Sequence, residues 1–258
     1  MRLSIIRSSL NRIAFHALAA LNRGRYRRYH VHGFTIFLNV SESPMMLARA
    51  RGRYDIDKIT LLRRILTAGM VFVDVGANKG DFTLLAATLV GPTGLVHAFE
   101  PAPGNVAMLR QSIAANGLTN IRVHDLALSD ASGEATLYLA GRRSGWHSLI
   151  GGLPDRDAGT VCVRTRRLDD FDLGSVHAIK IDVEGAEQMV LEGARETLVR
   201  NRPIVLVDLH PDLGVDLAAV AQFFAELDYS VSTTAGVQLA QTPERWVTDV
   251  VFSPAEIA

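Results

Sequence analysis

Short apolar segments alternate with amphipathic segments along most of the chain, beginning near residue 54. Runs that are mostly apolar, with little polar alternation, predict strands covered on both faces at 70–75, 95–100, 121–124, 178–182 and 204–209. Apolar residues at helical spacing predict helices at 55–66, 83–89, 105–116, 186–201 and 217–227. This order predicts an α/β fold in which a mostly parallel sheet carries helices on both faces.

Two segments depart from this alternation. Residues 134–168 hold two short strand patterns, 136–139 and 161–165, around a glycine- and arginine-rich stretch, and we interpret them as an inserted β-hairpin or lid. The last apolar stretches, 229–233 and 246–252, have no helical pattern between them, so we expect them to pair antiparallel at one edge. The sequence therefore predicts a mostly parallel, seven-stranded sheet with an antiparallel edge strand.

Residues 1–53 form an arm in this interpretation, and the folded domain occupies 54–258. Ile6, Leu10, Ile13, Ala17 and Leu21 repeat at helical spacing among seven arginines, with no acidic residue before Glu42. This basic amphipathic helix could lie on a membrane surface, although packing on the domain or on a second subunit of a homo-oligomer is the simpler expectation. Residues 32–40 could add a short strand that covers an edge of the domain.

Composition narrows the classes of partner. Basic and acidic residues both number 27, so no net positive field favours nucleic acid. Cys162 is the single cysteine, which excludes intramolecular disulfides and favours a reducing, cytoplasmic location. No run of 18 or more apolar residues occurs, so we expect no transmembrane segment.

The loop after the first buried strand carries the sharpest chemical signal. Its sequence, DVGANKG at 74–80, stands between a strand and a helix, where open α/β sheets bind ligands. Its two glycines allow unusual φ values and let a ligand approach the backbone. A dinucleotide fingerprint needs further glycines where Asn78 and Asp81 stand. The loop therefore favours a cofactor without phosphates, such as S-adenosylmethionine, over a nicotinamide dinucleotide, and Asp74 could face its ammonium group.

The next two strand ends suit the nucleoside half of such a cofactor. Glu100 follows the loop by roughly 20 residues, where acids that bind ribose hydroxyls are found. The alternative is a solvated loop residue. The third strand ends near Leu126, where apolar and backbone groups could hold adenine, and Asp125 or Asp130 could contact the adenine amine.

Acidic residues and a histidine end the fourth and fifth strands. Asp182 and Glu184 could orient the cofactor, accept a substrate proton or hold a divalent metal. Alternatively, Glu184 has no catalytic role, and its negative charge only interacts favourably with the helix dipole at a helix N-terminus. His210 is our preferred general base because histidine titrates near neutrality, unless it merely ends a strand. Asp182, Asp208 and His210 could instead ligate magnesium or manganese, which we do not expect.

Taken together, these segments resemble the FkbM family of S-adenosylmethionine-dependent methyltransferases. The resemblance rests on FVDVGANKGDFT (72–83), HAFEPAP (97–103), ALSDASGEATLYL (127–139), RRLDDF (166–171) and IKIDVEGAEQMVLEGA (179–194), and it spans roughly 54–212. It implies a Rossmann-like class I methyltransferase fold and O-methylation of a hydroxyl group on a sugar or secondary metabolite. Family members often carry glutamate where this chain has Asp208.

The residues expected to act follow from the strand ends and from this resemblance. The candidate cofactor contacts are Asp74, Gly76, Ala77, Asn78, Gly80, Thr83, Glu100, Pro101, Leu126, Ala127 and Asp182, and the candidate catalytic residues are His210, Asp182 and Glu184. Ser144, Trp146 and Ser148 in the insertion could contact cofactor or substrate, and the acceptor is expected to be a small molecule or glycan.

Two other functions stay open on the same fold. An N-methyltransferase usually carries an Asn/Asp-Pro-Pro-aromatic segment where this chain has DVEG at 182–185, which disfavours it. A non-catalytic nucleoside-binding module would keep the glycine loop but could dispense with Asp182 and His210. Their presence favours an enzyme.

Overall fold

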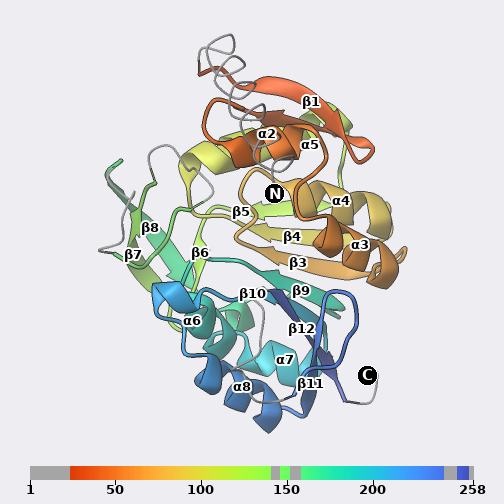
Figure 1. The fold of residues 1–258 in the computed structure, drawn as a ribbon, viewed down its shortest axis with the longest axis vertical. Helices are drawn as coiled ribbons and strands as arrows, with labels where there is room; N and C mark the ends of the chain where they lie inside the picture. The colour runs from red at the N-terminus through yellow and green to blue at the C-terminus, as the bar shows by residue number, and fades with distance from the viewer. Residues whose placement is uncertain (1–23, 141–145, 152–157, 241–248, 256–258) are drawn as a thin grey trace, which may run out of the picture.

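The computed structural model describes residues 24–140, 146–151, 158–240 and 249–255. Its largest sheet has seven strands in the order β11-β12-β10-β9-β3-β4-β5 (Figure 1). These strands are β3 (Val71–Val75), β4 (Leu95–Phe99), β5 (Ile121–His124), β9 (Ala178–Ile181), β10 (Ile204–Asp208), β11 (Tyr229–Thr233) and β12 (Asp249–Pro254). Each overlaps an apolar run that predicts a strand.

Pairing in this sheet is parallel from β10 across to β5 and antiparallel on both sides of β12. The predicted α/β fold with a mostly parallel seven-stranded sheet is therefore confirmed. The antiparallel strand lies one position inside the edge, because β11 pairs along its outer side. Trp246, in the first part of the last predicted strand, lies outside the described residues.

Helices cover both faces of the sheet. One face carries α3 (Ile56–Ile65), α4 (Asp81–Val90) and α5 (Pro103–Asn116), and the other carries α6 (Glu187–Glu192), α7 (Arg195–Asn201) and α8 (Leu217–Glu226). Successive strand residues face opposite sides of the sheet. Phe72 therefore packs in one core with α3 and α4, while Val73 packs in another with α6, α7 and α8. Because both faces are covered, the strands have the unbroken apolar runs that predict them.

The single helix predicted at 186–201 is wrong in one respect, because the structure has two helices there, α6 and α7. The break lies at Gly193, where an added Cβ would stand 2.0 Å from the Ser129 carbonyl oxygen. Only glycine lets the backbone pass so close to that loop. The Gly193 carbonyl accepts a hydrogen bond from the Asp169 N–H at 3.0 Å, which fixes the break in place.

The predicted insertion is a β-hairpin, as expected. Strands β7 (Gly133–Tyr138) and β8 (Thr160–Arg166) pair antiparallel, and β6 (Ala127–Leu128) adds to β8 in parallel. An isolated bridge between Tyr138 and Ser148 brings the described residues 146–151 back against β7. Ser144 lies outside the described residues.

The described part of the arm packs on the domain. It consists of β1 (Arg27–Val31), β2 (Phe34–Leu38) and α2 (Pro44–Ala50), of which only β2 has a counterpart among the predicted elements. Strand β2 packs on helix α5 rather than along a sheet edge, since the Thr35 N–H donates to Asn116 Oδ1 at 2.7 Å and the Phe37 N–H donates to Ser112 Oγ at 3.1 Å.

The basic helix predicted from Ile6 to Leu21 lies outside the described residues, so its contact with a membrane or a second subunit stays a prediction. Within the described ranges, no helix combines the length and apolar character needed to span a membrane.

Candidate active site

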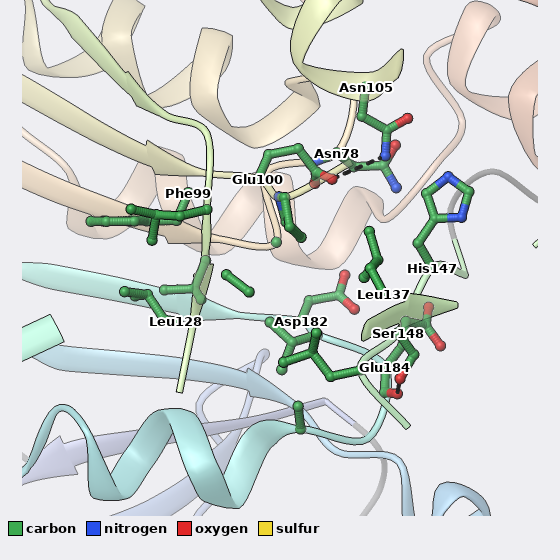
Figure 2. Close-up of a pocket in the computed structure, with 18 residues that line it drawn as sticks. Asn78, Phe99, Glu100, Asn105, Leu128, Leu137, His147, Ser148, Asp182 and Glu184 are labelled. Carbon is green, nitrogen blue, oxygen red and sulfur yellow. Dashed lines mark hydrogen bonds between the residues drawn. The ribbon is translucent and has the colours of Figure 1, made fainter. Parts of the chain in front are cut away.

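A cavity opens at the carboxyl ends of β3, β4 and β9 and is bordered by the inserted hairpin (Figure 2). Figure 2 shows Asn78, Glu100 and Asn105 along one wall, with Asp182 and Glu184 on the wall opposite. The carboxyl ends of parallel strands meet at one edge of a sheet, which is why residues far apart in the sequence come together here.

Most of the predicted cofactor residues line this cavity. They are Gly76, Asn78, Glu100, Pro101, Leu126, Ala127 and Asp182, and the predicted residues Glu184 and Ser148 join them. The cavity's described lining does not include Asp74, Ala77, Gly80, Thr83, Trp146 or His210. The cofactor contacts predicted for Asp74, Ala77, Gly80 and Thr83, the ligand contact predicted for Trp146 and the catalytic role predicted for His210 stay predictions.

The glycine loop holds the ends of three strands together. Gly76 has a φ of 76°, and an added Cβ would stand 1.9 Å from the Asp182 carbonyl oxygen at the end of β9. The N–H groups of Gly76 and Ala77 both donate to the Phe99 carbonyl at 3.0 Å, at the end of β4. Ala77 is buried and Gly80 begins α4 at a φ of 99°. The loop thus fixes the floor of the cavity through backbone contacts.

Glu100 is held rigidly at the cavity wall. Its Oε2 accepts the Asn78 N–H at 2.7 Å, and its Oε1 accepts the Ala102 N–H at 2.9 Å and the Asn105 amide at 3.3 Å. Burial raises the pKa of Glu100 above its ordinary value, although these hydrogen bonds oppose the shift. Each carboxylate oxygen has two lone pairs, so Oε2 still has capacity for a ligand hydroxyl.

Asp74 contacts Lys180 and Thr83 instead of the cavity. Thr83 Oγ1 donates to Asp74 Oδ2 at 2.6 Å, and Lys180 Nζ lies 3.6 Å from Asp74 Oδ1. The same Nζ lies 3.3 Å from Asp182 Oδ2. Burial would raise the pKa of Asp182, but the charges of Lys180, Lys58 and His210 together hold it below its ordinary value. The two described contacts of Asp74 therefore position Lys180, and through it an ionised Asp182 at the cavity wall.

Glu184 and His210 are two titratable neighbours beside the cavity. Glu184 Oε2 lies 3.5 Å from His210 Nε2, and Glu187 Oε1 lies 2.8 Å from His210 Nδ1. Burial, reinforced by the charge of Asp182, raises the pKa of Glu184 to about 8. Burial would lower the pKa of His210, but its hydrogen bond to Glu187 and the charge of Glu184 raise it to about 9. His210 is therefore largely a cation at neutral pH, and Glu184 titrates near neutrality.

Glu184 also has an unusual backbone. Its φ is 56°, in the left-handed region that non-glycine residues seldom adopt. The Ser148 hydroxyl donates to the Glu184 carbonyl at 2.5 Å, as Figure 2 shows. Strained backbone of this kind is found at functional sites, where the surroundings hold it in place. Ser148 thus connects the inserted segment to the backbone of Glu184.

The possible metal ligands Asp182, Asp208 and His210 each offer one atom within 4.8 Å of the others. Two lysines compete for the carboxylates, since Lys58 Nζ lies 2.8 Å from Asp208 Oδ2 and Lys180 Nζ approaches Asp182. His210 is protonated, and a metal needs the neutral imidazole.

We therefore expect chelation to leave methyl transfer unchanged, because lysine ammonium groups already neutralise these acids. The measurement is the rate of methyl transfer after dialysis against excess EDTA, compared with the rate after magnesium or manganese is added back. Loss of activity on dialysis that either metal restores would contradict this expectation.

Two polar cavity residues are not among the site residues predicted from the sequence. Asn105 donates to Glu100 from the first turn of α5, and helix-start rules applied after Pro103 could have suggested it. His147 lies in the inserted segment, where no periodicity gives its position. Neither Asp125 nor Asp130 is among the described lining residues, because Asp125 pairs with Arg110 at 2.8 Å and Asp130 accepts a hydrogen bond from Ser129.

Known proteins resemble this chain in both sequence and fold. The Methyltransferase FkbM domain matches residues 74–231. The 2-O-methyltransferase NoeI of Sinorhizobium fredii is 31% identical over 150 residues, which cover 51% of this chain and 60% of NoeI. The 31-O-demethyl-FK506 methyltransferase FkbM of Streptomyces tacrolimicus is 33% identical over 162 residues, which cover 51% of this chain and 62% of that enzyme.

The alignments span about three-fifths of the length of these two relatives. The crystal structure of methyltransferase FkbM from Methylobacillus flagellatus KT has the same fold, with a TM-score of 0.50 at 18% identity, over 97% of this chain and 60% of that one. The matched segment contains the glycine loop, Glu100, and the acids after β9. From the domain match and the shared fold, this chain belongs to the FkbM family of methyltransferases.

Proposed function

We propose that this chain is an S-adenosylmethionine-dependent O-methyltransferase that acts on a hydroxyl group of a small-molecule or glycan acceptor. The charge of the cavity carries the proposal. Among its described lining residues, Glu100, Asp182 and Glu184 are acidic and none is a lysine or an arginine. S-adenosylmethionine has a sulfonium and an ammonium group, which carboxylates attract, whereas the phosphates of a dinucleotide would be repelled.

The residues of the cavity fit the parts of this cofactor. Glu100 Oε2 has the capacity to accept a ribose hydroxyl, and Leu126 and Ala127 offer an apolar surface for adenine. Gly76 brings the loop backbone against Asp182, which supplies negative charge for an ammonium group. When bound, the cofactor supplies an activated methyl group.

Glu184 is the residue best suited to remove the proton of the acceptor hydroxyl. It lines the cavity, whereas the described lining does not include His210. A general base works best when its pKa lies near the working pH, and the pKa of Glu184 is raised to about 8. His210 is protonated beside it and stabilises the ionised carboxylate. We therefore assign the role of general base to Glu184 rather than to His210, which the sequence favours.

An oxygen acceptor is supported by the relatives, since the names of NoeI and of the Streptomyces enzyme both specify methylation at an oxygen. Ser148 and His147, at the hairpin end of the cavity, provide polar groups that suit a hydroxylated acceptor (Figure 2). Alignment of the acceptor oxygen with the methyl group would supply most of the rate enhancement, and proton removal by Glu184 would add to it.

The cofactor assignment is tested by Glu100→Gln. Glutamine keeps the shape of the side chain, but one of the two carboxylate oxygens becomes an NH₂ group. Both oxygens of Glu100 accept backbone N–H groups, so the variant has less capacity to accept a hydrogen bond from a ribose hydroxyl. We expect S-adenosylhomocysteine to bind about tenfold more weakly, measured by titration calorimetry. Glu192→Gln, on the exposed side of α6, is the control. Unchanged affinity in Glu100→Gln would reject the ribose assignment, and no binding by the unmodified protein would reject the proposed function.

A further inference from the structure

The acidic cavity is unfavourable for one part of the proposed cofactor. The methionine half of S-adenosylmethionine carries a carboxylate as well as an ammonium group. Asp182, which the charge of Lys180 helps to keep ionised, would repel that carboxylate, and the described lining includes neither lysine nor arginine. Burying a carboxylate without a cationic partner is strongly unfavourable for binding. The described residues around the cavity should therefore include a cation that can reach it.

Arg49, in the last turn of α2, is a cation that lies close enough to the cavity to bind a ligand carboxylate there. Its Nη1 lies 3.4 Å from Asn78 Oδ1, and Asn78 lines the cavity. Burial alone would lower the pKa of Arg49, but the charge of Asp81, the Tyr54 hydroxyl and, to a smaller extent, the charge of Asp182 raise it. Arg49 thus lies directly behind a lining residue, next to the side chain of Asn78.

Arg49 has unused hydrogen-bonding capacity. Its side chain is 5% exposed, and its guanidinium packs 4.3 Å over the Tyr54 ring. Asp81 Oδ2 lies 3.4 Å from Nη1, at a separation longer than a strong charged hydrogen bond. Within the described part of the chain, the buried Nε has no hydrogen-bond partner. A buried donor without a partner is unfavourable, and a ligand carboxylate would satisfy it.

The other buried cations near the loop have carboxylate partners of their own. Lys180 Nζ lies between Asp74 and Asp182, and Lys79 Nζ lies 3.0 Å from Glu42 Oε2. Lys58 Nζ contacts Asp208 and Asp249. Of these groups, Arg49 alone has the fork of donors that matches a carboxylate. Its described carboxylate partner, Asp81, lies at 3.4 Å, whereas each lysine has a carboxylate oxygen at 3.3 Å or less.

We propose that Arg49 binds the carboxylate of the amino-acid half of S-adenosylmethionine, so that the arm completes the cofactor site. This inference rests on the proposed function. Arg49 lies outside the segment 74–231 that matches the family domain, so the arm would contribute a cofactor contact that this domain lacks. The role of the arm then extends beyond packing on α5.

Two related ligands test the proposal. S-adenosylhomocysteine has the amino-acid half, and methylthioadenosine has the same nucleoside and thioether without it. In Arg49→Gln we expect the affinity for S-adenosylhomocysteine to fall about 10- to 100-fold, as for loss of a charged hydrogen-bonded pair, while the affinity for methylthioadenosine stays near that of the unmodified protein. Arg49→Lys should recover part of the loss. Titration calorimetry measures all of these affinities.

Asp81→Asn is the matched control, because it removes the partner of Arg49 while keeping the guanidinium. It should bind S-adenosylhomocysteine as tightly as the unmodified protein, or more tightly. Equal losses for both ligands in Arg49→Gln would mean a purely structural role and would overturn the proposal, as would unchanged affinity for both. Failure of the unmodified protein to bind either ligand would instead reject the proposed function.

Discussion

Glu184→Gln is expected to lower kcat by about 10²- to 10⁴-fold, the range for loss of a positioned general base. Glutamine keeps the size of the side chain but cannot accept a proton from the acceptor hydroxyl. Binding of S-adenosylhomocysteine should change little, because the ribose and loop contacts lie on Glu100 and Asn78. Steady-state rates together with calorimetry separate these two effects.

The pH dependence of the same reaction gives an independent check. Burial and the charge of Asp182 raise the pKa of Glu184 to about 8, so the carboxyl is protonated below that pH and ionised above it. A base acts only when ionised, so kcat should rise with pH through about 8 in the unmodified enzyme, and this rise should be lost in Glu184→Gln.

His210→Gln distinguishes the two candidate bases. The cationic His210 lowers the pKa of Glu184, so its removal should move the rise in kcat to higher pH and leave the rate at high pH largely intact. If His210 were the base, His210→Gln would abolish the pH-dependent rise and Glu184→Gln would only shift it. That pattern would refute the assignment of Glu184.

Strand positions and strand-end chemistry could be predicted from the sequence, because both depend on local patterns. An apolar run such as 71–75 predicts a strand that is buried because helices cover both faces of its sheet. The shared location of the glycine loop, Glu100 and Asp182 could also be predicted, because the carboxyl ends of parallel strands lie at one edge of the sheet. The same reasoning could not locate the break at Gly193, which depends on the distant Ser129 carbonyl.

The ionic partners of the site could not be predicted, because they join distant segments. Lys58 lies 150 residues from Asp208 in the sequence, and Arg49 reaches Asn78 from an element that no pattern predicts. Asp74 shows the consequence. The position of Asp74 in the loop predicts that its carboxylate contacts an ammonium group of the ligand. In the fold, the ammonium group of Lys180, from the neighbouring strand β9, lies beside it. The ammonium group described beside Asp74 therefore belongs to the protein.

Gly76→Ala is expected to be the most damaging single-methyl change in the site. The new Cβ would stand 1.9 Å from the Asp182 carbonyl oxygen, and the φ of 76° disfavours any residue with a Cβ. The ends of β3 and β9 would have to separate, which we expect to cost about 3 kcal/mol or more of unfolding free energy. The same separation would move Asp182 away from the loop, so S-adenosylhomocysteine binding should also be lost.

Gly117→Ala provides the matched control for this prediction. Gly117 follows α5 at a φ of 64° and a ψ of 25°, and an added Cβ would meet nothing within 4 Å. It therefore carries the penalty of the left-handed backbone alone, about 1 kcal/mol, with no clash. Urea unfolding should show Gly76→Ala to be much less stable than Gly117→Ala, and only Gly76→Ala should lose ligand affinity. Equal stability of the two variants, with binding retained in both, would show that the close approach of β3 to β9 does not hold the site together.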